Sequence, residues 1–305
     1  MPDLKIITGK EFVYHKAKEH IERPSRIKAI MKTLNELGIE YKKPPKIYEY
    51  NIYKLLKLAH SWKYIKIIKK LLNESYKTGE TIYVDGDTYI SPLTWISIFK
   101  SINTIAKSVD DIIENNHHIF AAIRPPGHHA GINGIANSIS QGFCIFNNAA
   151  IAAIYAKKKG FRNIIILDVD IHHGNGTEDI IRNVKNISYI SIHSTKIYPG
   201  TGYYSYNNII NYPLEPGTTD KEYIKTLNTV FQHIDNIDPD FIVISLGFDA
   251  HKNDPLSTFN ITLQPYKKLF EYLSKKDKVL YVLEGGYSLK TLKLGIIELA
   301  KIYIL

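Results

Sequence analysis

Cysteine is almost absent from this sequence, which contains a single one, Cys144, among 305 residues. No disulfide can form within the chain, and a closed structural zinc site made of four cysteines, or of two cysteines and two histidines, is excluded. This composition agrees with a reducing compartment, so we expect a cytoplasmic protein. Cys144 lies in the apolar run GFCIF, which favours a small buried hydrophobic residue over a nucleophile.

Long apolar runs are also absent. No stretch of 18 or more apolar residues occurs, which excludes a helical membrane span. The first residues, MPDLKIITGKEF, lack the apolar core of a signal peptide and predict a strand instead. The net charge of +9 comes from lysines spread along the chain, with no block longer than Lys157–Lys159. Nucleic-acid binding is therefore not indicated, and we expect no membrane partner.

Three common enzyme motifs are missing as well. The chain has no G-x-S-x-G elbow, no G-x-x-x-x-G-K-[ST] loop and no G-x-G-x-x-G fingerprint. The sequence therefore gives little support to a serine hydrolase of the α/β-hydrolase type, to a P-loop nucleotidase or to a dinucleotide-binding enzyme.

Short apolar runs alternate with helical patterns along the whole chain. They predict strands at 3–8, 46–50, 118–123, 163–170, 187–193, 241–250 and 278–287. Helical spacing of apolar residues predicts helices at 22–38, 62–76, 146–160, 220–235 and 264–275, at the end of the chain, and in a segment capped by Ser91 and Pro92 that runs to Asn115. This alternation predicts an α/β fold with an open, mainly parallel sheet and helices on both faces. Without an internal repeat or linker, we expect a single domain.

Five successive strands end in polar or glycine-rich residues: GHHA, DVDIHHG, IH…YPGTG, GFDAH and EGGY. Because parallel strands end at the same edge of a sheet, these segments predict one active site. The most informative segment is IIILDVDIHHGNG, in which Asp168, Asp170 and His172 alternate and so project to the same side. Carboxylates are rarely buried alone, and a divalent cation is the simplest partner for them.

A metal site can be assembled from Asp170, His172 and Asp249. Three protein ligands with one open position are typical of catalytic zinc, and the same oxygen and nitrogen donors also suit Fe(II), Mn(II) or Co(II). The alternative is a structural hydrogen-bond network without a metal.

The tandem histidines His128 and His129 follow a strand and a rigid Pro-Pro pair. Their side chains titrate near neutrality and suit general acid–base catalysis, provided that a partner fixes each tautomer. Asp168 and Asn175 are available as such partners. A carboxylate raises the basicity of an imidazole and an amide does not, so the two pairings would differ.

Three aromatic residues complete the candidate site. The Tyr287 hydroxyl, after Gly285 and Gly286, could donate to an oxyanion, while Phe143 and Tyr198 could line a channel. Core packing is the alternative for each of them.

In their order along the chain, these motifs resemble those of the histone deacetylase / acetylpolyamine amidohydrolase superfamily in its compact prokaryotic form. The resemblance rests on ERPSR, DGDTYISP, RPPGHHAG, QGFCIFNNAAIAA, LDVDIHHGNGTED, SIH…YPGTG, SLGFDAHKNDPL and LEGGYSLKTL. It implies the arginase/deacetylase-like fold, with residues 1–305 forming one deacetylase catalytic domain.

The resemblance also implies a role for each matched residue. Zinc would be bound by Asp170, His172 and Asp249, and His129 would act as general base and then general acid. His128 would be an electrostatic partner, and Tyr287 would donate to the scissile carbonyl. The pairs would be Asp168 with His128 and Asn175 with His129. The remaining implied positions are the tunnel residues Gly142, Phe143 and Tyr198, the rim residue Asp87, the exit-region residue Arg26, and a structural potassium site at Asp168, Asp170, His172, Ser191 and Ile192.

Three positions depart from the family pattern. Asn175 replaces an aspartate of one branch and so resembles the class II branch. The rim loop 131–141 is longer than usual. Leu256 stands where members that prefer polyamines tend to carry an acidic residue, which favours a substrate other than a free polyamine.

We therefore expect a zinc-dependent amidohydrolase that removes acetyl or other short acyl groups from lysine in protein or from a small acetylated amine. The alternatives are an acetylpolyamine amidohydrolase, an arginase-like binuclear hydrolase and a non-catalytic protein that binds acylated ligands. The sequence does not indicate an oligomeric state.

Overall fold

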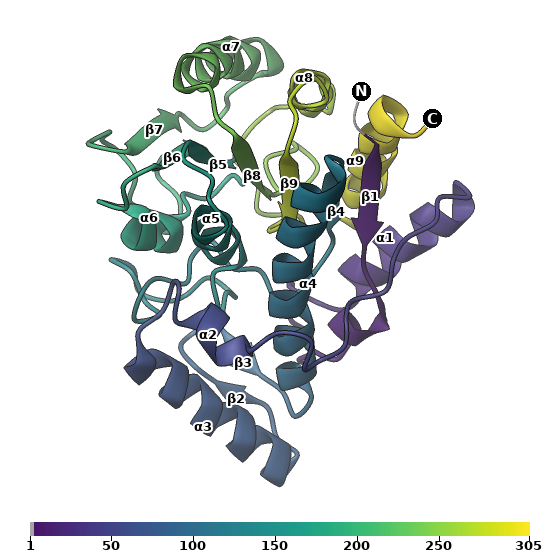
Figure 1. Ribbon diagram of the computed structural model, residues 1–305, viewed down its shortest axis with the longest axis vertical. Helices are drawn as coiled ribbons and strands as arrows, with labels where there is room; N and C mark the ends of the chain where they lie inside the picture. Colours follow the sequence, from purple (N-terminus) through teal and green to yellow (C-terminus); the bar gives the residue numbers. More distant parts are fainter. Residues whose placement is uncertain (1–2) are drawn as a thin grey trace.

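A seven-stranded β-sheet forms the centre of the computed structural model, which describes residues 3–305 (Figure 1). Its strand order is β1-β4-β9-β8-β5-β6-β7, and all neighbouring strands run parallel. The predicted parallel α/β sheet is confirmed. The strands are β1 (Leu4–Ile7), β4 (His118–Ala121), β5 (Ile164–Asp168), β6 (Ile187–Ser194), β7 (Ile209–Leu214), β8 (Phe241–Leu246) and β9 (Val279–Leu283), and a separate antiparallel pair is formed by β2 (Ile82–Tyr83) and β3 (Tyr89–Ile90).

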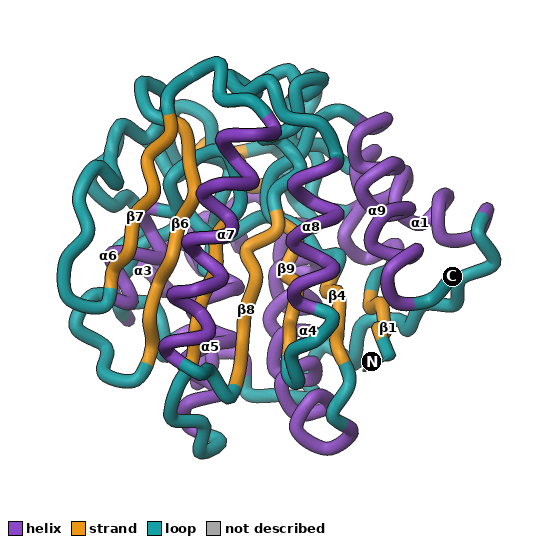
Figure 2. Tube along the Cα trace, turned by 90° about the horizontal axis from the view of Figure 1, so that it is seen from above, coloured by secondary structure: helices purple, strands orange, loops and turns teal. Residues whose placement is uncertain are grey.

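Helices cover both faces of this sheet within a single domain. Figure 2 shows α7 and α8 in front of the sheet and α4 and α5 behind it. On the face that α7 and α8 cover, α8 packs between α7 and α9, and α9 also packs against α1. The helices are α1 (Ser25–Glu36), α2 (Ile52–Leu56), α3 (Trp62–Thr78), α4 (Thr94–Asn115), α5 (Asn148–Lys158), α6 (Asn175–Ile181), α7 (Asp220–Ile237), α8 (Gln264–Leu273) and α9 (Leu289–Tyr303), with a 3₁₀ turn η1 at Lys10–Val13. Among residues 3–305, no helix has the length and apolar character that crossing a membrane requires.

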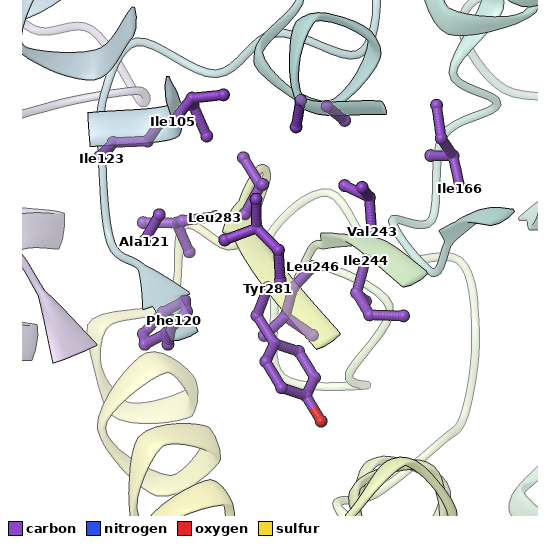
Figure 3. Packing of buried hydrophobic residues seen from close by; sticks show 14 of the residues in the cluster. Ile105, Phe120, Ala121, Ile123, Ile166, Val243, Ile244, Leu246, Tyr281 and Leu283 are labelled. Carbon is purple, nitrogen blue, oxygen red and sulfur yellow. The ribbon is translucent and has the colours of Figure 1, made fainter. Parts of the chain in front are cut away.

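The central strands are buried on both faces, which explains their nearly continuous apolar sequences. Every residue of β5, β8 and β9 is buried. Val243 and Ile244 are consecutive in β8, and Figure 3 shows them pointing to opposite sides of the sheet, as the two-residue repeat of a strand requires.

The topology brings the predicted functional segments together. From β5 the chain continues to β6 and β7, and it then returns to the other side of β5 to form β8 and β9. The direction of strand addition therefore reverses between β5 and β8, and open α/β sheets bind ligands at such a point. The five strands with polar ends, β4, β9, β8, β5 and β6, are consecutive neighbours in the sheet.

One predicted strand is absent from the structure, and one predicted helix begins later than expected. The strand predicted at 46–50 is wrong, because these residues form turns whose backbone is bound by a helix α4 side chain: Asn103 accepts from Tyr50 N at 2.9 Å and donates to Ile47 O at 2.7 Å. Helix α4 begins at Thr94 rather than at Ser91, because the Thr94 hydroxyl accepts the Ser91 N–H at 2.9 Å. The elements that were not predicted are α2, α6, β7, the 3₁₀ turn η1 and the β2–β3 pair, part of which was expected to be a loop.

Candidate active site

The loops after β5 and β8 carry the candidate metal ligands. Asp168 is the last residue of β5, Asp170 and His172 follow it, and Asp249 lies three residues beyond the end of β8. Gly285 follows the end of strand β9 and lies beside Asp170 and Asp249, where only glycine fits. A Cβ atom on Gly285 would lie 2.0 Å from Oδ2 of Asp249 and 2.5 Å from Oδ2 of Asp170. Only a residue without a side chain allows the backbone of β9 to approach both carboxylates this closely.

Asp170, His172 and Asp249 converge as the sequence predicts. Nδ1 of His172 lies 3.0 Å from Oδ1 of Asp170 and 3.3 Å from Oδ2 of Asp249. One ligand atom from each residue lies within 4.8 Å of the other two. Oδ2 of Asp249 is buried and has no hydrogen-bond partner, whereas Oδ1 accepts the Ile171 N–H at 3.1 Å.

The charges of this group favour a bound cation. Burial and the neighbouring Asp170 carboxylate raise the pKa of Asp249 to about 7. Burial also opposes ionisation of Asp170, but His128 and His172 outweigh it and hold the pKa of Asp170 far below its usual value. Two buried carboxylates and an imidazole with an unpaired oxygen are a donor set suited to zinc, Fe(II), Mn(II) or Co(II). The residues therefore fit a divalent metal, and the orphaned Asp249 oxygen is the atom that a metal would satisfy.

His128 is paired with a carboxylate. Its Nδ1 lies 3.0 Å from Oδ2 of Asp168, and the same oxygen accepts the Tyr189 hydroxyl at 3.0 Å. Burial opposes protonation of His128, but the carboxylates of Asp170 and Asp168 outweigh it and raise its pKa to about 10. In the absence of a metal, His128 is therefore a cation at neutral pH.

His129 is paired with an amide. Its Nδ1 lies 2.7 Å from Oδ1 of Asn175, whose Nδ2 donates to the carbonyl of Ala136. The Ala136 contact fixes the amide orientation, so Oδ1 accepts the Nδ1–H of His129 and leaves Nε2 as a free base. Burial, followed by repulsion from His128 and His172, holds the pKa of His129 well below its usual value. The two adjacent histidines therefore differ in charge, as their different partners predict.

Glu284 supports the tandem histidines and was missed in the sequence. It is fully buried at the end of β9, and its Oε2 accepts the backbone N–H of Gly127 at 2.7 Å and of His128 at 3.2 Å. Burial raises the pKa of Glu284 to about 7. A usable signal was present, because this acidic residue directly follows a buried strand.

Tyr287 is held near the ligands by neighbouring loops. Asp254 accepts the N–H groups of Tyr287 and Ser288 at 2.6 and 2.8 Å. The guanidinium of Arg26 lies 5.1 Å from the Tyr287 ring centroid. Arg26 also donates to the carbonyl of Gly286 at 2.6 Å and to that of Glu284, so it fixes the backbone beneath Tyr287.

The predicted tunnel residues also lie together. The Tyr198 ring lies 4.8 Å from that of His129, and the Phe143 ring lies 5.8 Å from that of Tyr287, both in edge-to-face geometry. Gly142 lies against both the Tyr198 and the His129 rings: a Cβ there would lie 2.8 Å from a Tyr198 ring carbon and 2.5 Å from a His129 ring carbon.

The rim positions are linked through Ser140. Its hydroxyl donates to Asp87 at 2.8 Å, and its carbonyl accepts the Tyr198 hydroxyl at 2.8 Å. The loop 131–141 is therefore attached to Asp87, to Tyr198 and, through Ala136, to Asn175. Leu256 is partly buried, and its N–H donates to Asp254 at 3.1 Å.

The predicted potassium residues lie on two adjacent strands and the loop that follows. Ser191 is opposite Asp168 in the β5–β6 ladder, and its hydroxyl lies 2.9 Å from Nδ1 of His193. Ile192 is buried. The potassium site stays a prediction.

Three comparisons relate this architecture to known proteins. The sequence model of the histone deacetylase domain matches residues 20–302. Histone deacetylase 15 of Arabidopsis thaliana is 32% identical, over 99% of this chain and 56% of its own length. The crystal structure of the HDA15 HD domain has a TM-score of 0.89 and 29% identity, and the match covers 99% of this chain and 88% of that one. An acetylpolyamine aminohydrolase from Burkholderia pseudomallei has a TM-score of 0.87 at 21% identity, covers 99% and 98% of the two chains, and shows the shared fold alone.

Proposed function

The chain belongs to the histone deacetylase domain family, and we propose on that premise that it is a metal-dependent deacetylase. It hydrolyses the amide of an N-acetylated lysine in protein, or of a small acetylated amine. We assign this activity to one catalytic domain that spans the chain.

One observation carries the proposal. The side chains of Asp170 and His172 lie close to Oδ2 of Asp249, which accepts no hydrogen bond. Beside them, His128 is paired with a carboxylate and His129 with an amide. In a structural hydrogen-bond network a buried carboxylate oxygen accepts a hydrogen bond, because the loss of one costs about 1–3 kcal/mol. Oδ2 of Asp249 accepts none and has only Nδ1 of His172 beside it, at 3.3 Å. A catalytic metal site with an open position explains it.

The reaction can be written for the residues of this chain. A cation held by Asp170, His172 and Asp249 would polarise the substrate carbonyl and acidify the attacking water. Nε2 of His129 accepts the proton of that water while Asn175 holds Nδ1–H, and it later delivers the proton to the leaving amine. The Tyr287 hydroxyl donates to the developing oxyanion. His128, paired with Asp168, adds positive charge beside the same oxyanion.

The channel walls define the substrate class. Phe143 and Tyr198 are aromatic, and Gly142, which presents no side chain beside Tyr198, gives the proposed channel a narrow wall that suits an unbranched chain. The methylene groups of a lysine side chain match such a channel in shape and polarity. Asp87 at the rim and Leu256 beside the Tyr287 loop are the proposed contacts for the substrate outside the channel, and Arg26 is assigned to the exit region.

A substrate panel tests this proposal. Acetyl-lysine peptides, longer acyl-lysines, acetylpolyamines and arginine are offered to the wild type and to Asp249→Ala, and the released amine is measured. We expect hydrolysis of acetylated amines by the wild type alone. Hydrolysis of arginine, or binding of acyl-lysine without turnover, would replace the proposal with the arginase-like or the non-catalytic alternative.

A further inference from the structure

A second group of metal-binding side chains lies beside His128. A ring nitrogen of His128, Sγ of Cys144 and a carboxylate oxygen of Glu284 lie within 4.8 Å of one another. All three residues are at least 97% buried. We propose that this group binds a soft divalent cation, Zn²⁺ or Cd²⁺, at a second site that inhibits the enzyme. The binding claim stands by itself, and only the inhibition rests on the proposed function.

Each of the three residues has a donor atom that is not fully used. Oε2 of Glu284 accepts two backbone N–H groups, but Oε1 has only the Ser245 hydroxyl at 3.4 Å. Nδ1 of His128 is bonded to Asp168, which leaves Nε2 available. Sγ of Cys144 makes one long contact, 3.4 Å from the carbonyl of Gly142.

These donors select the class of metal. A thiolate, an imidazole and a carboxylate form a mixed sulfur, nitrogen and oxygen set that favours zinc and its softer analogue cadmium over magnesium or calcium. Zinc bonds of about 2.0–2.3 Å require the ligand atoms to approach to within about 4 Å of one another. The three donor atoms lie within 4.8 Å of one another, so a contraction of at most about 1 Å brings them to that spacing.

Protons compete with the metal at this site. Burial raises the pKa of the Cys144 thiol and raises that of Glu284 to about 7. Binding therefore releases protons, and its affinity increases with pH. The same burial limits the access of a cation to the three donor atoms.

A cation bound at this second site changes the role of His128. Its Nε2 lies 3.8 Å from Oδ1 of Asp170, at the boundary between the two groups of ligands. A cation bound to this nitrogen occupies the ring edge that faces Asp170, so Nε2 can no longer donate a hydrogen bond towards the first group of ligands. The site therefore acts as an inhibitory switch that a chelator reverses.

The single cysteine makes the site measurable without an activity assay. Asp170, His172 and Asp249 contain no sulfur, and Cys144 is the one cysteine of the chain. The near-ultraviolet absorbance of a cadmium–thiolate bond therefore reports this group alone. Cadmium is titrated into folded protein that already holds one equivalent of zinc, and absorbance and acetyl-lysine hydrolysis are followed together. We expect the absorbance to saturate near one further equivalent while activity falls in parallel.

Three variants distinguish metal binding at the second site from inhibition and from the proposed deacetylase activity. Cys144→Ser removes the absorbance and makes turnover resistant to cadmium, whereas Glu284→Gln weakens binding by at least about tenfold. Asp249→Ala abolishes turnover but keeps the absorbance, so failure of the proposed function is distinct from failure of this site. Circular dichroism establishes that each variant is folded. Absence of thiolate absorbance in the wild type, or equal inhibition of the wild type and Cys144→Ser, would overturn the proposal.

Discussion

Nδ1 of His129 lies 2.7 Å from Oδ1 of Asn175, and the Asn175 amide is itself oriented by the carbonyl of Ala136 in the rim loop. A loop at the entrance of the site thereby sets the tautomer of the proposed general base. The loop 131–141, which the resemblance predicts to be longer than usual, carries this carbonyl.

Asn175→Ala removes the partner that holds Nδ1–H of His129. Because the imidazole can then adopt the other tautomer, we expect kcat to fall by about 10–100-fold while metal content is unchanged. Steady-state kinetics and metal analysis measure both quantities. Asn73→Ala, at an exposed position of α3, is the matched control and should keep full activity.

Tyr287→Phe removes the proposed oxyanion donor without changing the ring that packs edge-to-face on Phe143. Loss of one such donor typically lowers kcat by about 10²–10³-fold. We expect this loss with an almost unchanged KM, whereas Tyr203→Phe at an exposed position should have no effect. A Tyr287→Phe enzyme with wild-type turnover would remove Tyr287 from the mechanism.

Gly142→Ala tests whether catalysis requires a residue without a side chain at the proposed channel wall. Gly142 has φ +48°, and an added Cβ would lie 2.5 Å from the His129 ring. Gly38 has a similar φ of +68° but no atom within 4 Å of an added Cβ, so Gly38→Ala has the same backbone strain without the clash. Gly38→Ala should lose about 1–2 kcal/mol of stability in urea unfolding, and Gly142→Ala should lose more because its Cβ also meets the His129 ring. Only Gly142→Ala should lose activity; equal activity of the two variants would show that catalysis does not need the space at Gly142.

Glu22→Ala tests the buried charges behind Tyr287. Glu22 forms a two-point ion pair with Arg124 and lies 3.0 Å from Arg26, and all three side chains are fully buried. Removing the carboxylate leaves two buried cations unpaired, so we expect a loss of about 3–5 kcal/mol in the free energy of unfolding. Glu36→Ala breaks the exposed pair with Lys293 and should have a much smaller effect. Equal effects would show that the buried network contributes nothing specific.

His60 should make stability depend on pH. Burial lowers its pKa to about 4 and outweighs the hydrogen bond from Nδ1 to Gly131 O at 2.8 Å, which raises it. In the neutral form Nε2 accepts the Asn147 N–H at 2.9 Å. The unfolded chain binds this proton below about pH 6.5 and the folded chain only below about pH 4, so protonation favours unfolding as pH falls between these values. The contribution at pH 5 is a loss of about 2 kcal/mol.

Urea unfolding at pH 7.5 and pH 5 measures this contribution as a difference between proteins. His60→Gln keeps a donor and an acceptor but does not titrate, so its stability should fall less over this range than that of the wild type. Parallel losses in the two proteins would assign the acid sensitivity to other groups.

Patterns along the chain were sufficient to predict most of the sheet and the convergence of the three proposed ligands. Asp170, His172 and Asp249 could be predicted because they follow buried strands, and parallel strands end at one edge. Strand β7 was missed because it contains Pro213 and lies at the edge of the sheet, where its pattern is only partly apolar. The predicted strand at 46–50 failed because Asn103, more than 50 residues away, binds its backbone.

Other parts of the site depend on contacts that have no local signal. The Ala136 carbonyl is a backbone atom in a loop, so residue type could not indicate its contact with Asn175. The two hydrogen bonds from Gly127 and His128 to Glu284 depend on β4 and β9 being neighbours in the sheet. Sequence separation hides both contacts, and only the folded chain shows them.

The central claim is that Asp170, His172 and Asp249 hold one catalytic metal ion. It is tested most directly by removing the metal and adding zinc back in measured equivalents. The protein is stripped with a chelator, zinc is added back in steps, and the release of acetate from an acetyl-lysine peptide is measured beside bound metal. The account predicts that stripping abolishes turnover, that one equivalent restores it, and that Asp249→Ala is not restored. Turnover that survives stripping, or that requires two equivalents, would contradict a catalytic metal held by Asp170, His172 and Asp249.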